Sequence, residues 1–271
     1  MDNGIHFISG LPRSGSSLLS AILLQNPRFH AGISSPVAGL FQVLTHQMSE
    51  NRESAALVDE EARREVLSGL FDNYYFRQHP SKVVFDTNRF WASKAPALGQ
   101  LFPASKMICC VRHVPWIIDS LERLHHRNGL DPSAIYNFDP AGTVYSRFDA
   151  IKSGSGLVGY AWNATREAFY GGNADRLMLL TYETLVAQPE KAMSAVYEFL
   201  GERDFDHDFD HVELDASEFD KRFGARGLHS VRNRVTDERR STVLPPDIWL
   251  RVEQDSFWRK PALNPNGVKV V

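Results

Sequence analysis

The residues best suited to chemistry lie in one segment, residues 10–17 (GLPRSGSS), directly after the apolar run 5–9. Two glycines separated by four residues precede two serines, which is the skeleton of a phosphate-binding loop. Between a strand and a helix, such a loop binds anions, because backbone N–H groups point inward and the helix N-terminus adds about half a positive charge. An ordinary polar turn is the alternative. The residues expected to contact the anion are Pro12, Arg13, Ser14, Gly15, Ser16 and Ser17.

The position of positive charge in this loop separates it from the loop of nucleotide triphosphatases. Ser16 stands where those proteins have a lysine that reaches the β- and γ-phosphates. Arg13, inside the turn, supplies a planar guanidinium that can bind an anion through several hydrogen bonds. The loop therefore favours a phosphate donor other than ATP.

A second candidate anion site follows the apolar run 107–111. The run ends in Arg112, a helix is expected after Pro115, and Ser120 lies two turns into that helix. A phosphate-loop ATPase would end such a strand in an aspartate that helps to hold Mg²⁺, whereas arginine binds anions. The alternative is that Arg112 pairs with a local carboxylate and that Ser120 is incidental.

The elements that must position these residues are strands and helices in alternation. Short apolar runs at 5–9, 83–86, 107–111 and 176–182 predict buried parallel strands. Helical spacing predicts helices at 16–25, 55–75, 116–127, 158–170, 189–200 and 246–257. We expect an α/β fold, a parallel sheet of four to five strands with helices on both faces. Ligands of such sheets bind beyond the carboxyl ends of the strands. Residues 129–155 are interpreted as a long loop, and 204–220 as acidic, solvated surface.

Length, charge and cysteine content restrict the remaining possibilities. A chain of 271 residues predicts a single domain over 1–271, and a net charge of −3 indicates no nucleic-acid partner. Cys109 and Cys110 are adjacent in a predicted strand and point to opposite faces, so they are poor disulfide partners. The first strand leaves no room for a signal peptide, and no apolar run is long enough to span a membrane. These features predict a cytoplasmic protein.

Both anion motifs resemble those of sulfotransferases that use 3′-phosphoadenosine 5′-phosphosulfate (PAPS). The run PRSGSSLL is similar to their 5′-phosphosulfate loop, and the pair Arg112 and Ser120 matches the motif that binds the 3′-phosphate. The loop, and LFP at 101–103, are nearer the bacterial and tyrosylprotein branches than the cytosolic small-molecule branch. Residues 179–201 also resemble the family, and the likeness extends in order over about residues 5–260.

The resemblance implies a phosphate-loop-like fold and transfer of a sulfuryl group from PAPS to a hydroxyl or amine acceptor. The product is 3′-phosphoadenosine 5′-phosphate (PAP), and no metal is required. The resemblance places Tyr182 beside the nucleotide and Arg232, or alternatively Arg234, in a loop that closes over the adenosine. The acceptor is expected to be a small molecule or a peptide, and the oligomeric state is left open.

Sulfuryl transfer needs positive charge at the bridging oxygen that leaves with the phosphate. Arg13 is the first candidate for this role. Arg89, after the run 83–86, is the second, because the family has a cation at this strand end. Lys94 is the runner-up, and an ion pair between Arg89 and Asp86 is the alternative.

The acceptor must also lose a proton to a base. The tyrosylprotein branch has a glutamate about twenty residues after the loop arginine, but residues 31–36 contain no carboxylate. This absence speaks against protein tyrosine as the acceptor. Asp86, at the end of a strand, is predicted to be the base, with His46 and His113 as alternatives. Core packing or an apolar acceptor pocket accounts for Phe41, Phe90, Trp91 and Trp116.

Two other functions are consistent with the same residues. One is a kinase or nucleotide triphosphatase with an altered phosphate loop, which would bind ATP with Mg²⁺. The other is a protein that binds PAP without turnover, an interpretation based on the missing glutamate.

Overall fold

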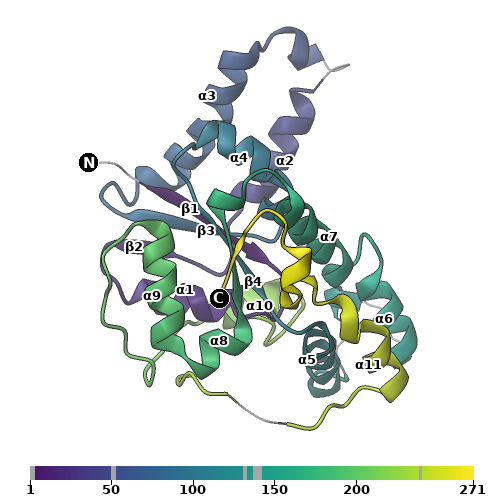
Figure 1. Ribbon diagram of the computed structural model, residues 1–271. Helices are drawn as coiled ribbons and strands as arrows, with labels where there is room; N and C mark the ends of the chain where they lie inside the picture. Colours follow the sequence, from purple (N-terminus) through teal and green to yellow (C-terminus); the bar gives the residue numbers. More distant parts are fainter. Residues whose placement is uncertain (1–3, 50–52, 131–132, 137–141, 238–239) are drawn as a thin grey trace.

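One parallel sheet forms the centre of the protein in the computed structural model, which describes residues 4–49, 53–130, 133–136, 142–237 and 240–271 (Figure 1). Its six strands run in the order β2-β3-β1-β4-β5-β6, and every pair is parallel. The strands are β1 (Ile5–Gly10), β2 (Phe29–Ala31), β3 (Val83–Thr87), β4 (Met107–Val111), β5 (Leu177–Thr181) and β6 (Lys269–Val270). The predicted parallel α/β fold is confirmed.

The predicted number of strands, four to five, is too low because two edge strands were missed. Strand β2 has three residues and β6 has two, so neither forms a recognisable apolar run. The four predicted strands occupy the centre of the sheet. A single domain over residues 1–271 stays a prediction.

Helices cover both faces of the sheet, as predicted (Figure 1). Helices α1 (Ser16–Leu24), α8 (Tyr182–Ala187) and α9 (Pro189–Leu200) contribute to the apolar cluster on one face. The cluster on the other face includes side chains from α2 (Val37–Gln47), α3 (Glu60–Phe71), α4 (Ala95–Leu101), α5 (Val114–Arg127), α6 (Val144–Lys152), α7 (Leu157–Tyr170) and α11 (Pro246–Val252). The remaining described α-helix, α10 (Ser217–Arg222), precedes the residues 228–240, several of which line the cavity at the strand ends.

Successive side chains of the central strands pack into opposite clusters, as the period of a strand requires. Phe7 belongs to one cluster and Ile8 to the other. Cys109 and Cys110 are divided in the same way, and both are free and fully buried. Burial raises the pKa of both thiols, which makes them structural rather than reactive groups.

Some predicted elements differ from those observed. The helix expected at 55–75 is α3, followed by a π-helical turn over Asp72–Phe76. The loop expected at 129–155 contains α6, which begins where Thr143 accepts a hydrogen bond from the Ser146 N–H; residues 131–132 and 137–141 lie outside the described part. The acidic segment 204–220 is not all solvated surface, because α10 carries the buried Asp220.

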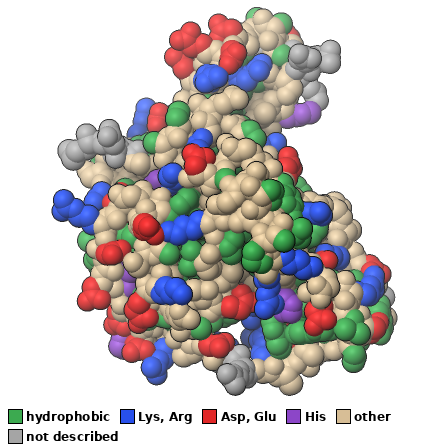
Figure 2. Space-filling model, in the orientation of Figure 1, with side chains coloured by type: hydrophobic (Ala, Val, Ile, Leu, Met, Phe, Trp, Pro, Cys, Tyr) green, Lys and Arg blue, Asp and Glu red, His purple; other side chains and the backbone are tan. Residues whose placement is uncertain are grey.

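Helices α2 and α3 extend away from the sheet (Figure 1). On the face shown in Figure 2, acidic and basic side chains are interspersed and do not form a basic stripe. The absence of a nucleic-acid partner stays a prediction. Among the described residues, no helix combines the length and apolar character needed to cross a bilayer.

A buried histidine on β1 predicts acid sensitivity. The His6 ring accepts a hydrogen bond at Nδ1 from the Lys106 N–H at 3.0 Å. Burial, followed by the charge of Lys106, lowers its pKa from 6.5 to about 4. The unfolded chain therefore takes up the proton first, and the free energy of unfolding falls as the pH drops from 6.5 towards 4. The expected loss from this residue is about 3 kcal/mol at the acid end.

Urea unfolding of the wild type and of His6→Gln at pH 7 and at acid pH measures this effect. The variant is expected to lose less stability on acidification than the wild type. His30, whose pKa burial also lowers, titrates in both proteins, so the difference between them isolates His6. An identical pH dependence in both would contradict the prediction.

Candidate active site

The carboxyl ends of β1, β3, β4 and β5 open into one cavity of about 870 Å³. The residues that follow these strands and line it include Pro12, Arg13, Gly15, Ser16, Ser17, Asn88, Arg89, Arg112 and Tyr182. Residues from beyond α10 line it as well, among them Leu228, His229, Arg232 and Arg240. The predicted site residues that follow separate strands thus lie around one cavity, as the parallel sheet implies.

Two glycines give the loop its shape. Gly10 has φ +106°, and a Cβ there would lie 2.2 Å from the carbonyl oxygen of Cys110 on the neighbouring strand. Gly15 has φ +93° and is the N-cap of α1. Because Gly15 has no side chain to accept the first N–H groups of α1, these donors remain available for an anion at the helix N-terminus.

Ser14 differs from the other predicted loop ligands. Its side chain is buried, and its hydroxyl donates to the Pro12 carbonyl at 3.3 Å. It does not line the cavity, whereas Ser16 and Ser17 do. The structure therefore does not support a hydroxyl contact from Ser14 to the anion.

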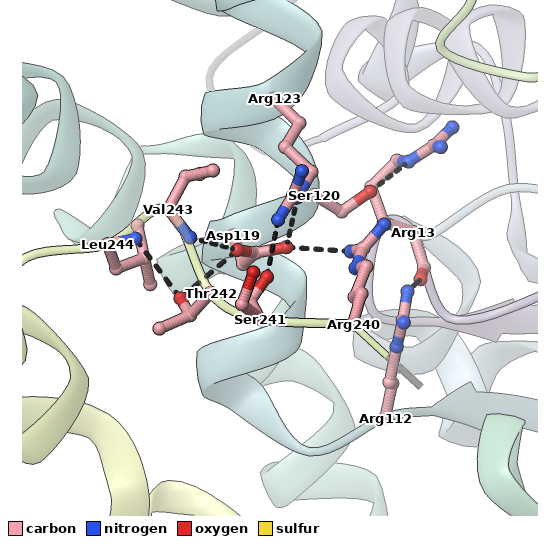
Figure 3. A network of polar contacts seen from close by, with 10 residues as sticks. All are labelled: Arg13, Arg112, Asp119, Ser120, Arg123, Arg240, Ser241, Thr242, Val243 and Leu244. Carbon is pink, nitrogen blue, oxygen red and sulfur yellow. Dashed lines mark hydrogen bonds and ion pairs between the residues drawn. The ribbon is translucent and has the colours of Figure 1, made fainter. Parts of the chain in front are cut away.

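Arg13 connects the loop to two distant segments, and Figure 3 shows its contact with one of them, at Ser120. Its Nε donates to Ser120 Oγ at 3.0 Å, and Nη1 donates to the carbonyls of Leu228 and Gly227. Its φ of 58° places a non-glycine residue in the left-handed region, a conformation that costs about 1–3 kcal/mol and is concentrated at functional sites. Burial and the neighbouring charge of Arg112 lower the pKa of Arg13 to about 10.

Arg112 lies where the sequence predicted it, at the end of β4. Its guanidinium is 4.2 Å from the centroid of the Tyr182 ring, and Nη1 donates to the Arg13 carbonyl at 3.3 Å. Burial lowers the pKa of Arg112, and the charge of Arg240 lowers it further. A bound anion would offset this repulsion, so the cations form a site suited to phosphate.

Sequence reasoning missed Arg240 and the carboxylate that holds it (Figure 3). Asp119, fully buried on α5, forms ion pairs with Arg123 at 3.0 Å and with Arg240 at 2.7 Å. The same carboxylate accepts hydrogen bonds from Thr242 Oγ1 and the Val243 N–H. Asp119 therefore fixes the segment 240–243 beside α5. The available signal was an acidic residue directly before Ser120 in the predicted helix.

Arg89 lines the cavity, and burial lowers its pKa. The alternative in which it pairs with Asp86 is wrong, because Asp86 accepts hydrogen bonds from Ser35 and Trp91. Lys94, the runner-up, does not line the cavity and lies 5.1 Å from the centroid of the Phe90 ring.

The structure does not support Asp86 as the base. Its side chain is fully buried, and Ser35 and Trp91 occupy its oxygens. Burial raises its pKa, but the carboxyl does not line the cavity and cannot reach an acceptor there. Ser35 is 51 residues from Asp86 in the chain, so tertiary packing and not the strand end determines the surroundings of Asp86.

Neither alternative base has a free position in the cavity. His46 is exposed on α2 and does not line it. His113 lines it, but its ring Nε2 lies 3.3 Å from the Glu253 carbonyl oxygen, and its backbone N–H donates to Glu183 Oε1. Ile33 and Ser34 do line the cavity, so the segment that lacks the expected glutamate reaches the site.

The four aromatic residues considered for an acceptor pocket are divided between the core and the cavity. Phe41, Phe90 and Trp91 belong to the core, whereas Trp116 lines the cavity and contacts Trp249 edge-on at 4.9 Å. Arg232 and Arg234 also line the cavity, and Arg234 forms an ion pair with Asp210 at 2.6 Å.

Comparison with known proteins places this arrangement in a family. A model of the sulfotransferase family matches residues 6–207. The chain belongs to this family. Protein-tyrosine sulfotransferase 2 of Gallus gallus is 24% identical over 218 residues, which cover 77% of this chain and 54% of that protein. Protein-tyrosine sulfotransferase 1 of Danio rerio is 24% identical over 208 residues, covering 73% of this chain and 53% of that one.

The sulfotransferase fold is also shared with a solved structure. A sulfotransferase from Alicyclobacillus acidocaldarius superposes with a TM-score of 0.50 at 16% identity, over 82% of this chain and 92% of that chain. The chain spans about half the length of the two curated relatives. The resemblance to the bacterial and tyrosylprotein branches is confirmed by these comparisons.

Proposed function

We propose that this sulfotransferase transfers a sulfuryl group from PAPS to a hydroxyl or amine acceptor and releases PAP. The observation that carries the proposal is the opening of two anion sites into one cavity. One is the loop before α1, and the other is the pair Arg112 and Ser120. PAPS carries anionic groups at both ends of its ribose, so it matches two such sites.

We assign the 5′-phosphosulfate to the loop and the 3′-phosphate to Arg112 and Ser120. The backbone donors of the loop, Ser16 and Ser17 hold the first group. Tyr182, whose ring contacts Arg112, lies beside the nucleotide, and Arg232 adds positive charge from the segment after α10. Arg240, held by Asp119, is a further ligand of the 3′-phosphate that the motifs alone do not indicate.

The proposed reaction places positive charge where negative charge develops. As the bond between sulfur and the bridging oxygen breaks, the 5′-phosphate of PAP gains charge. Arg13 and Arg89, both lining the cavity, stabilise that charge. Both are partly buried, which strengthens the interaction relative to water. We propose that no metal takes part, which EDTA treatment of the active protein tests directly.

The acceptor is proposed to be a small molecule or a peptide that carries a hydroxyl group. The relatives are named for protein tyrosine, so p-cresol, a minimal phenol, is the first probe. A cytoplasmic location, proposed from the two buried thiols, is tested by cell fractionation.

Thermal unfolding with PAP, AMP, ADP, and ATP with Mg²⁺ tests the donor assignment. PAP at about 100 times its Kd is expected to stabilise the protein by about 2.7 kcal/mol and to raise Tm by about 5 °C or more. The shift is expected to be independent of Mg²⁺ and larger than that with AMP. A shift with ATP and Mg²⁺ but none with PAP would overturn the proposal in favour of a kinase or nucleotide triphosphatase.

A second outcome concerns turnover. If PAP stabilises the protein but a panel of hydroxyl and amine acceptors, p-cresol and water included, takes no sulfate from PAPS, the protein binds the nucleotide without this transfer. The proposed reaction would then be replaced by nucleotide binding alone.

A further inference from the structure

A histidine and a buried aspartate form a pair at the wall of the cavity. His229 Nδ1 lies 2.6 Å from Asp220 Oδ1, and the His229 backbone N–H donates to Asp220 Oδ2 at 2.9 Å. Asp220 is 2% exposed, so its carboxylate faces His229 and not solvent. Because carboxylate oxygens only accept, Nδ1 carries the ring hydrogen, and Nε2 is left with a lone pair.

The Nε2 side of the ring is available to a ligand. His229 lines the cavity, and Nε2 has no hydrogen-bond partner among the described residues. Burial lowers the pKa of His229 below 6.5, and Arg89 and Arg13 lower it further, against the opposing effect of Asp220. The ring is therefore neutral at pH 7. The same interactions place it near the two arginines proposed to stabilise the leaving group.

The loop arginine and an aromatic side chain hold this histidine in position. Arg13 donates to the carbonyls of Leu228 and Gly227, directly before His229 in the chain. Phe219 contacts the His229 ring edge-on at 5.4 Å. Phe219 and Phe223 lie nearly parallel, line the cavity and are 40% and 43% exposed. They give the wall around His229 an apolar surface suited to an aromatic or apolar acceptor.

We propose that His229 is the general base of the transfer and that Asp220 is the residue that positions it. The inference rests on the proposed function. The acceptor O–H proton passes to Nε2 as the acceptor oxygen bonds to sulfur. The bond from sulfur to the bridging oxygen breaks, and its electron pair stays on the 5′-phosphate of PAP. The proton then leaves Nε2 for solvent, so the ring returns to its neutral form.

The assignment also accounts for the missing glutamate. Ile33 and Ser34 line the cavity where the tyrosylprotein branch was expected to supply a carboxylate. His229 comes from another segment, after α10, and faces the same cavity. The base is thus supplied from the opposite end of the chain.

The release of PAP from PAPS tests the proposal, with p-cresol or with water alone as the acceptor. The acceptor that gives the faster reaction with the wild type is then used for all variants. His229→Gln is expected to lower kcat about a hundredfold while the PAP-induced thermal shift stays within the range of the wild type. Imidazole is expected to restore part of the activity of His229→Ala. His211→Gln is the matched control, because His211 pairs with Asp208 at 2.8 Å but lies outside the cavity. It is expected to retain full activity.

Asp220→Asn tests the positioning role through the pH profile. In this variant the amide oxygen accepts the hydrogen bond from the His229 backbone N–H, so the amide NH₂ group faces Nδ1 of the ring. An NH₂ group donates, so Nδ1 must accept and the ring hydrogen moves to Nε2. The lone pair on Nε2 that would take the proton is then lost. We expect at least a tenfold loss of kcat. Loss of the carboxylate also moves the acid limb of kcat/KM to lower pH, since Asp220 raises the pKa of His229 while Arg13 and Arg89 lower it. A merely structural role would leave the acid limb unchanged.

The outcomes separate this inference from the proposed function. A His229→Gln variant that retains wild-type kcat, or a His229→Ala variant that imidazole does not rescue while PAP still binds, would overturn the role of His229. A wild type that PAP does not stabilise, or that releases no PAP from PAPS, would overturn the proposed function and the inference with it.

Discussion

Replacing Arg13 with alanine is expected to lower kcat about 10²–10³-fold, the range seen when one preorganised donor to developing charge is removed. Arg13 lines the cavity at the loop, and its partly buried guanidinium is proposed to face the bridging oxygen. The same change frees Ser120 Oγ and the Leu228 carbonyl. The expected loss of kcat therefore has two sources. One is the lost stabilisation of charge in the transition state, and the other is displacement of the turn at Gly227 and Leu228. Single-turnover release of PAP from PAPS with p-cresol measures it.

The matched control for Arg13→Ala removes another arginine, one that does not line the cavity. Arg28→Ala removes a side chain that is 59% exposed and paired with Glu202, and it is expected to leave kcat unchanged. Arg13→Lys keeps the charge but loses the planar fork, so we expect it to recover only part of the activity. A threefold or smaller loss in Arg13→Ala would remove Arg13 from the catalytic step.

The second large effect concerns the 3′-phosphate. Arg112→Ala is expected to weaken PAP about a hundredfold, because a buried, charge-assisted contact to phosphate is lost. AMP lacks the 3′-phosphate, so its affinity is expected to change by less than about threefold. Isothermal titration with both nucleotides measures the difference, which is the quantity that assigns the residue.

The control here is Arg251→Ala, an exposed arginine that pairs with Asp149. It is expected to leave both affinities as in the wild type. Equal losses for PAP and AMP in Arg112→Ala would mean that Arg112 supports the fold of the site through its contact with Tyr182 and does not read the 3′-phosphate.

The donor side could be predicted from sequence because its residues follow strands directly. Gly10 ends β1, Gly15 begins the loop's exit into α1, and Arg112 directly follows β4, while Ser120 follows from the period of α5. A parallel sheet brings strand ends together without further information. The central strands were predictable for a related reason, since each is apolar on both faces.

The rest depends on contacts between segments that are remote in sequence. Asp86 was expected at an accessible strand end, but Ser35 closes over it from 51 residues away. Arg240 reaches the site through Asp119, on a different segment. Asp220 lies on α10, and His229 comes nine residues later in the irregular segment after that helix, so no period indicates that they meet. Such pairs become visible only when the chain is folded.

The family pattern ends at residue 207, whereas α10, His229 and Arg240 all lie beyond it. The cavity is thus assembled from a shared part of the chain and a part outside the matched region. The first holds the phosphosulfate loop and Arg112, and the second supplies His229 beside the proposed acceptor and Arg240 beside the proposed 3′-phosphate. Under the proposed function, substitutions around His229 can therefore alter the acceptor side while the loop before α1 stays unchanged. Arg13 spans the boundary, so its two carbonyl contacts limit how far that wall can diverge.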